Sequence, residues 1–233
     1  MPRKVTRREF MAATGGSVLS IGLPGAFCKL SAEENRIVAG ELRADGKPRL
    51  PPGQHAVKSL PDMGGFEGPG RHSSWRLKLY GEVDKPVVLS FDDLAKMDRV
   101  TVTCDVHCVT GWTLLDSKWS GIGLKTIMDF VGIKDQARYV IFYAPENYSA
   151  NIPMDEARKD NVILADTFSN RPLPLDHGSP LRALVADLYF WKSVKWVESI
   201  KFSAKDEPGF YETRGYSNSA DPWKEERHEK AGN

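Results

Sequence analysis

The chain has 233 residues with a formal net charge of +1, and 41% of them are hydrophobic and 27% charged. These globular values exclude disorder as the general state, and the length allows a core that folds without disulfides or metal. The balanced charge excludes a protein that coats nucleic acid, because such a protein needs a basic surface. The three cysteines cannot all pair with one another, so at least one thiol needs another explanation.

Residues 1–32 have the pattern of an export signal. A basic front precedes Met11–Phe27, an uncharged run that is short for a membrane span and rich in glycine. The segment Thr6–Met11 (TRREFM) resembles the twin-arginine export motif. We therefore expect export to the periplasm by the twin-arginine route and cleavage near Ala32, which leaves a mature chain with a net charge near −3.

Residues 33–74 are rich in proline and glycine and lack periodicity, which predicts an extended arm or loop. Regular patterning begins at residue 75, so we expect residues 75–233 to form one domain. Periodicity predicts strands at 75–79, 100–108, 139–143, 162–166, 181–185 and 196–202, and helices at 90–97, 124–131 and 155–158. Because strands outnumber helices and their spacing is irregular, we expect the α+β class with a mixed, β-rich core.

The strand predicted at 100–108 contains Cys104, His107 and Cys108. In a regular strand the two cysteines face the same side about 13 Å apart. A disulfide needs Cα atoms within about 7 Å, so the two cannot pair unless the strand breaks. Zinc is an alternative for these three residues, although a structural zinc site needs four ligands at turn-forming spacings. For Cys104 we expect a small buried side chain, the commonest role of a free cysteine.

Cys108 ends this strand and begins a segment with Gly111 and Trp112. The run His107–Trp112 (HCVTGW), followed by Trp119–Gly121, resembles the hallmark of molybdopterin-binding oxidoreductases of the sulfite oxidase type, and above all of the small bacterial sulfite oxidase-like proteins. The resemblance implies a molybdenum-molybdopterin cofactor, with Cys108 as the thiolate ligand of the metal and His107 beside it. A soft thiolate suits a redox-active metal.

Two further segments resemble the cofactor-binding parts of this family. In Leu173–Arg182 the resemblance implies that His177 and Arg182 hold the pterin, and the planar fork of an arginine suits a phosphate. Tyr189–Val197 resembles the lysine-bearing cofactor loop. A solvated strand edge is the alternative for its lysines. The pterin contacts that the resemblance implies in this loop are Ser193, Val194 and Lys195.

The segment Glu207–Tyr216 is similar to the C-terminal part of the small bacterial group. The resemblance implies that Tyr216 is an active-site tyrosine, whose phenol donates a hydrogen bond near the metal or to the substrate. The alternative is that Tyr211 and Tyr216 only pack over the core. The chain departs from sulfite oxidases proper after Cys108, because it lacks the arginines that attract the sulfite anion there. Arginines elsewhere in the chain that could replace them are Arg138, Arg171 and Arg214.

The resemblance covers Arg76–Arg227 and implies a periplasmic molybdenum oxidoreductase. Such an enzyme transfers an oxygen atom to or from a small sulfur or nitrogen oxide, and the direction and the substrate stay open. Since the chain has no C-x-x-C-H haem motif, we expect a separate haem-containing electron-transfer partner. We also expect a monomer. The other function class is a non-catalytic exported binding protein that retains the fold, and the cofactor motifs count against it.

Overall fold

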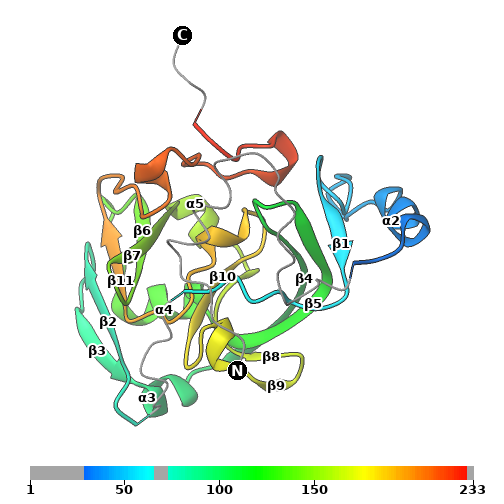
Figure 1. Ribbon diagram of the computed structural model, residues 1–233. Helices are drawn as coiled ribbons and strands as arrows, with labels where there is room; N and C mark the ends of the chain where they lie inside the picture. Colours follow the sequence, from blue (N-terminus) through cyan, green and yellow to red (C-terminus); the bar gives the residue numbers. More distant parts are fainter. Residues whose placement is uncertain (1–28, 66–72, 230–233) are drawn as a thin grey trace.

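Two β-sheets form the framework of the computed structural model, which describes residues 29–65 and 73–229 (Figure 1). The expected export motif and Cys28 lie outside the described residues. The first sheet runs in the order β1 (His55–Val57), β5 (Trp112–Gly123), β8 (Val162–Phe168), β10 (Arg182–Val185), with β4 (Arg99–His107) paired to β5 and β9 (Arg171–Pro172) paired to β8. The second runs in the order β3 (Val87–Ser90), β2 (Arg76–Gly81), β11 (Ser199–Ser203), β6 (Tyr139–Ala144), β7 (Tyr148–Pro153). Parallel and antiparallel pairs occur in both sheets, which confirms the α+β class with a mixed, β-rich core.

Short helices connect the strands. In α3 (Phe91–Ala95) the Ser90 hydroxyl accepts from the Asp93 amide, and the Asp93 carboxylate accepts from the Ser90 amide. This reciprocal cap satisfies donors that the first turn would leave unpaired. The longer α4 (Leu124–Val131) ends at Gly132, whose φ of 67° suits glycine. A single turn, α5 (Met154–Ala157), follows β7. No helix in the described part of the chain is long and apolar enough to span a bilayer.

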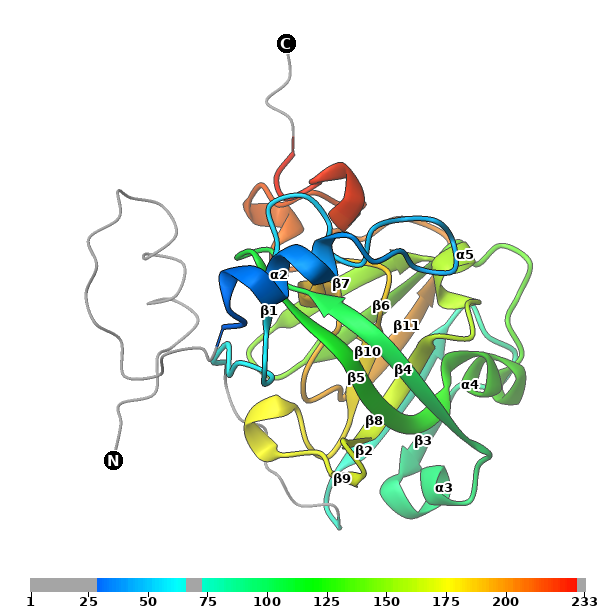
Figure 2. The ribbon, with the colours of Figure 1, turned by 90° about the vertical axis from the view of Figure 1, so that its right-hand side faces the viewer.

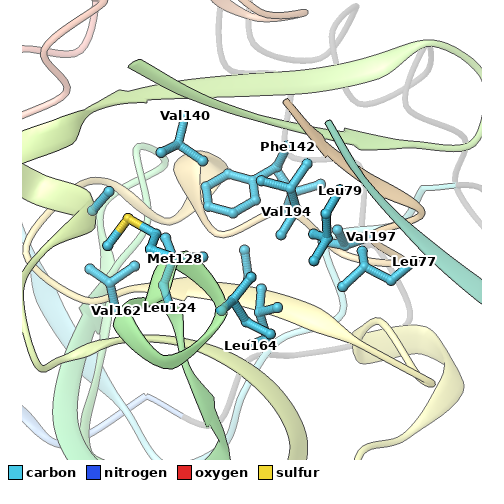
Figure 3. Packing of buried hydrophobic residues seen from close by; sticks show 14 of the residues in the cluster. Leu77, Leu79, Leu124, Met128, Val140, Phe142, Val162, Leu164, Val194 and Val197 are labelled. Atoms are coloured by element: carbon cyan, nitrogen blue, oxygen red, sulfur yellow. The ribbon is translucent and has the colours of Figure 1, made fainter. Parts of the chain in front are cut away.

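The main core lies between the two sheets, and α4 contributes one face to it. Figure 3 shows Leu124 and Met128 of α4 among side chains that come from both sheets. The helix buries its residues at positions i, i+3, i+4 and i+7, as its periodicity predicts. Each fully buried aliphatic side chain contributes about 1.5–3 kcal/mol, so this core holds the sheets in a fixed relation. The residues labelled from the sheets and loops are Leu77, Leu79, Val140, Phe142, Val162, Leu164, Val194 and Val197.

The segment expected to be an extended arm contains regular structure. Residues Ala32–Ala39 form α2, and β1 pairs in parallel with β5. Figures 1 and 2 show this segment along the outer side of β4 and β5. Arg49 donates to both oxygens of Asp105, at 2.8 and 2.6 Å, and thereby ties the segment to β4. Three residues are too short for an alternating pattern, which explains why β1 was not predicted.

The structure differs from the sequence prediction at further strands. Strands β3, β5, β7 and β9 were not predicted, and β11 begins at Ser199 rather than at residue 196 because Trp196 has a φ of 55°. In β4 the pairing with β5 shifts between Cys104 and Val106, so the strand is not regular between the two cysteines. Both thiols are free.

Candidate active site

Six of the eight sequence-predicted site residues line one pocket. The pocket contains about 740 Å³ of space between atoms, part of it open to solvent. Its walls come from the segment before β2, the turn after β4, the starts of β7 and β10, the segments on either side of β10, and the C-terminal segment. The six residues are Cys108, His177, Arg182, Ser193, Lys195 and Tyr216.

The turn between β4 and β5 presents Cys108 to the pocket. The Cys108 amide donates to the Trp112 carbonyl at 2.8 Å, and the Gly111 amide donates to the Cys108 carbonyl at 3.0 Å. Gly111 has a φ of 97°, which favours glycine. The Thr110 hydroxyl donates to the Cys108 sulfur at 3.2 Å. Burial raises the pKa of the Cys108 thiol, and the Thr110 hydrogen bond and the charge of Arg227 oppose that rise.

Cys104 and His107 are held outside this pocket. The Cys104 sulfur lies 3.8 Å from the Ser117 hydroxyl, and burial raises the pKa of the thiol to about 12. His107 is fully buried, with Nδ1 2.9 Å from the Thr113 hydroxyl, and burial lowers its pKa to about 4. Among the described residues there is no group of three or more His, Cys, Asp or Glu side chains placed to hold a metal ion. The zinc alternative therefore gains no support from the structure.

Arg182 is a buried cation, and no carboxylate pairs with it among the residues that the structure describes. Its guanidinium donates to the carbonyls of His177 and Ser193, at 3.0 and 2.8 Å, and lies 4.2 Å from the Phe190 ring centroid. Burial lowers the pKa of Arg182 to about 9. Its Nε has no hydrogen-bond partner within the described residues. A buried charge without a counter-ion is costly, so this position favours an anionic ligand.

The same wall of the pocket carries more positive charge. The Lys195 ammonium donates to the Asp176 carbonyl at 2.6 Å and lies 3.5 Å from the Asp62 carboxylate. A Cβ on Gly178 would lie 3.0 Å from both Arg182 and Lys195, so glycine allows these residues to come together. No Asp or Glu lines the pocket in the part of the chain that the structure describes. Arginine and lysine with a free cysteine at one pocket fit a phosphate-bearing cofactor whose metal takes a thiolate.

Aromatic rings form another part of the pocket lining. The ring centroids of Trp191 and Tyr216 are 5.4 Å apart, those of Tyr211 and Tyr216 are 4.8 Å apart, and those of Tyr148 and Tyr211 are 5.8 Å apart. The Tyr148 hydroxyl donates to the Trp191 carbonyl at 2.9 Å. Tyr216 therefore packs in this cluster and also lines the pocket, and its role as an active-site tyrosine stays a prediction.

Other sequence predictions fall away from the pocket. Val194 is buried in the main core rather than in the pocket wall. None of the three arginines suggested as replacements for the sulfite-attracting residues lines the pocket. Arg138 donates to the Ala137 carbonyl at 3.0 Å, Arg214 donates to the Phe210 carbonyl at 2.7 Å, and Arg171 is exposed in β9.

Several lining residues were not predicted from the sequence, namely Pro61, Met63, Gly64, Tyr148, Phe190 and Trp191. Phe190 and Trp191 stand in the segment that resembles the cofactor loop, so their position could have signalled a role. Tyr148 begins β7, which was not predicted, and its place in the wall depends on long-range packing.

Residues 66–211 match the family described as the oxidoreductase molybdopterin binding domain, and these residues are more than half of the chain. The chain belongs to this family. It is thus a molybdopterin-binding oxidoreductase, as the resemblance of His107–Trp112 implied, and its membership counts against a non-catalytic binding protein. The pocket described above is the place in the chain where Cys108 and the two other cofactor segments meet.

Known proteins of similar sequence share this oxidoreductase character. YuiH of Bacillus subtilis, described as an uncharacterized oxidoreductase, is 38% identical over 187 residues, which are 79% of this chain and 94% of YuiH. MsrP of Xanthomonas campestris, a protein-methionine-sulfoxide reductase catalytic subunit, is 31% identical over 149 residues, which are 57% of this chain and 46% of MsrP. The match therefore spans nearly all of YuiH but about half of MsrP.

The fold is also that of a solved structure. The sulfane dehydrogenase SoxCD from Paracoccus pantotrophus superposes with a TM-score of 0.57 at 20% sequence identity. The similar region covers 82% of this chain and 56% of the SoxCD chain. This similarity supports the molybdopterin-binding fold.

Proposed function

We propose that this oxidoreductase transfers an oxygen atom from an organic sulfur or nitrogen oxide, most directly a sulfoxide, at the pocket of Cys108. One observation carries the proposal: the Cys108 thiol, the Arg182 cation, which has no carboxylate partner among the described residues, and an aromatic wall share one pocket. The name of one relative, a protein-methionine-sulfoxide reductase catalytic subunit, indicates sulfoxide chemistry and supports this choice.

In this proposal some residues of the pocket hold the cofactor and others contact the substrate. Cys108 would hold the molybdenum through its thiolate, and Arg182, Lys195 and Ser193 would hold the anionic and polar parts of the molybdopterin. His177 stands beside Arg182 in the same wall. When bound, this cofactor supplies two-electron oxygen-atom transfer, while the protein positions it and shapes the pocket.

The aromatic wall then serves the substrate. Trp191, Tyr211 and Tyr148 exclude water and contact the organic groups on the sulfur, and Tyr216 donates a hydrogen bond to the oxide oxygen. In the net reaction the sulfur–oxygen bond breaks, sulfur gains two electrons, and the oxygen leaves as water with two protons. The apolar wall favours an organic oxide over the sulfite dianion, because a dianion needs cations on its exposed sides.

The electrons for this reaction come from outside the chain. We propose a haem-containing donor protein that supplies them one at a time, and the name of MsrP as a catalytic subunit supports a separate partner. We also propose that the protein acts as a monomer in the periplasm after twin-arginine export. Arg7→Lys with Arg8→Lys should keep the protein in the cytoplasm, as cell fractionation would show, and undiminished export would contradict the route.

A substrate panel tests the proposed reaction. Cofactor-loaded protein is assayed with dimethyl sulfoxide, free and peptide-bound methionine sulfoxide, and trimethylamine N-oxide, with reduced benzyl viologen as the electron donor. Sulfite is assayed in the opposite direction with ferricyanide as the acceptor. We expect reduction of sulfoxides that Cys108→Ser abolishes. Oxidation of sulfite without any sulfoxide reduction would overturn the proposed direction and substrate class.

A further inference from the structure

The turn that carries Cys108 is fixed by segments outside residues 66–211, which match the family. The Gln54 side-chain amide donates to the Cys108 carbonyl at 3.0 Å, and the His55 amide donates to the Gly111 carbonyl at 2.9 Å. The Arg227 guanidinium donates to the Val109 carbonyl between them. Three carbonyls of a four-residue turn thus have donors from sequence-remote residues, which restricts the turn to one conformation.

Arg227 joins this turn to two other segments of the chain. Its second terminal nitrogen lies 3.4 Å from the Pro52 carbonyl, and its guanidinium lies 5.2 Å from the Tyr189 ring centroid. The Arg227 carbonyl accepts from the Ser217 amide at 3.2 Å. The neighbouring residue His228 pairs with Tyr216, so the segment of Arg227 also holds the aromatic wall.

The surroundings of Arg227 suit a residue that positions the Cys108 turn rather than one that contacts the substrate. Arg227 is half-buried and does not line the pocket, whereas Val109, whose carbonyl it binds, does. Arginine can bind two carbonyls at once through its planar fork, which a lysine cannot do in the same way. In metal sites, residues that hold the ligands in place affect metal affinity or activity by about 10–100-fold.

We propose that Arg227 is a positioning residue that fixes the Cys108 turn, and with it the thiolate that would hold molybdenum. This inference rests on the proposed function, since it takes Cys108 as the metal ligand. It extends the active unit beyond the family-matched residues to the segment 215–229, which supplies Arg227 and holds Tyr216.

The test compares Arg227→Gln and Arg227→Lys with the wild type. Arg138→Gln is the matched control, because Arg138 also donates to main-chain carbonyls but does not line the pocket or touch the turn. The measurements are molybdenum content, the electron paramagnetic resonance spectrum and midpoint potential of the bound metal, kcat and KM for dimethyl sulfoxide, and the melting temperature. The spectrum and potential respond to the geometry at the metal and to the charge near it, and Arg227→Lys keeps that charge while it changes the hydrogen bonds to the turn.

We expect Arg227→Gln to shift the spectrum and lower kcat about tenfold at a similar KM, while its melting temperature stays close to that of Arg138→Gln. Arg227→Lys should give a smaller spectral shift and a kcat about threefold below wild type. If Arg227→Gln does not fold, the same measurements on Arg227→Lys test the inference. If the wild type binds molybdenum and the Arg227 variants have the same spectrum and kcat as the wild type, the inference about Arg227 is wrong while the proposed function stands. A wild type that binds no molybdenum overturns the proposed function and this inference together.

Discussion

The Lys192 ammonium lies 2.5 Å from the Glu212 carboxylate in a place where the two side chains are 0% and 2% exposed. The same carboxylate oxygen accepts from the Trp191 indole at 3.0 Å, and the ammonium donates to Asn151 at 2.8 Å. This buried ion pair therefore anchors one ring of the aromatic wall from behind.

The first prediction concerns this pair. Lys192→Met leaves the Glu212 carboxylate buried without its cation, so the free energy of unfolding should fall by about 3–5 kcal/mol. Lys192→Met combined with Glu212→Gln removes both charges and keeps an acceptor for Trp191, so it should recover at least half of the loss. Urea unfolding of cofactor-free protein measures the free energy of unfolding of the single and the double variant. Equal destabilisation in the single and double variants would show that the charge pairing is not what matters.

The second prediction separates the two cysteines. Cys108→Ser should fold normally and lose oxygen-transfer activity by more than about 100-fold, because serine is a poor ligand for a soft metal. Cys104→Ser should keep its activity within about twofold, since that thiol contacts Ser117 outside the pocket. Circular dichroism checks the fold and steady-state kinetics checks the activity. Equal loss in both variants would indicate a shared site instead.

The third prediction concerns Arg182. Arg182→Met removes a buried cation that has no carboxylate partner in the described part of the chain, so the stability of cofactor-free protein should change by less than about 2 kcal/mol. Cofactor content should fall by about tenfold or more, because the anionic ligand loses its buried partner. The control Arg76→Gln changes an exposed arginine that also donates to two carbonyls. Full cofactor content in Arg182→Met would refute the assignment.

The fourth prediction concerns pH. Burial alone would raise the pKa of Asp187, but hydrogen bonds from Arg43, Asn161 and Lys159 lower it to about 2 from an ordinary value of 3.8. The folded state thus binds fewer protons than the unfolded state between these values, so this stabilisation is complete above pH 4 and is lost as pH falls toward 2. It amounts to about 2 kcal/mol at neutral pH.

Asp187→Asn should therefore lose about 2 kcal/mol at pH 7, and the gap to wild type should narrow by about pH 2.5, as urea unfolding at each pH measures. Asp45→Asn is the control, because Asp45 also pairs with Arg43 but is more exposed, at 43% against 19%. Its loss should stay under about 0.5 kcal/mol. A gap between Asp187→Asn and wild type that does not change with pH would contradict the account.

The fifth prediction compares two glycines with positive φ. Gly111 has a φ of 97° and a Cβ there would lie 3.2 Å from the Gly53 carbonyl oxygen, whereas Gly46 has a φ of 79° and open space around it. Gly46→Ala should cost about 1 kcal/mol from the backbone conformation alone. Gly111→Ala should cost about 2 kcal/mol and lower the cofactor content, because the Cys108 turn must move. The same cost and cofactor content in both variants would show that the turn tolerates the contact.

Local patterns were sufficient for much of the fold. The spacing of Leu124, Ile127, Met128 and Val131 predicted α4 with its buried face, and Ser90 with Asp93 predicted the start of α3. These features depend on neighbours within one or two helical turns. The arm from residue 33 could not be predicted, since β1 exists through pairing with β5 and the contact of Arg49 with Asp105 spans 56 residues.

The candidate site also contains residues that local sequence patterns predict and residues that they do not predict. Cys108, Arg182 and Lys195 stand in short segments that resemble family motifs, and the pocket contains all three. His107 and Val194 stand in the same segments, next to residues that line the pocket. Their own side chains point elsewhere and are buried in the protein interior. Gln54 and Arg227 carry no local signal, because their role arises only where distant segments meet at the Cys108 turn.

The central claim is that Cys108 holds molybdenum in this pocket, and elemental analysis tests it most directly. Protein produced with cofactor supply should contain about one molybdenum atom per chain, and Cys108→Ser should contain less than about a tenth of that amount. Wild-type protein with a molybdenum content near zero, or Cys108→Ser with the full content, would contradict the claim.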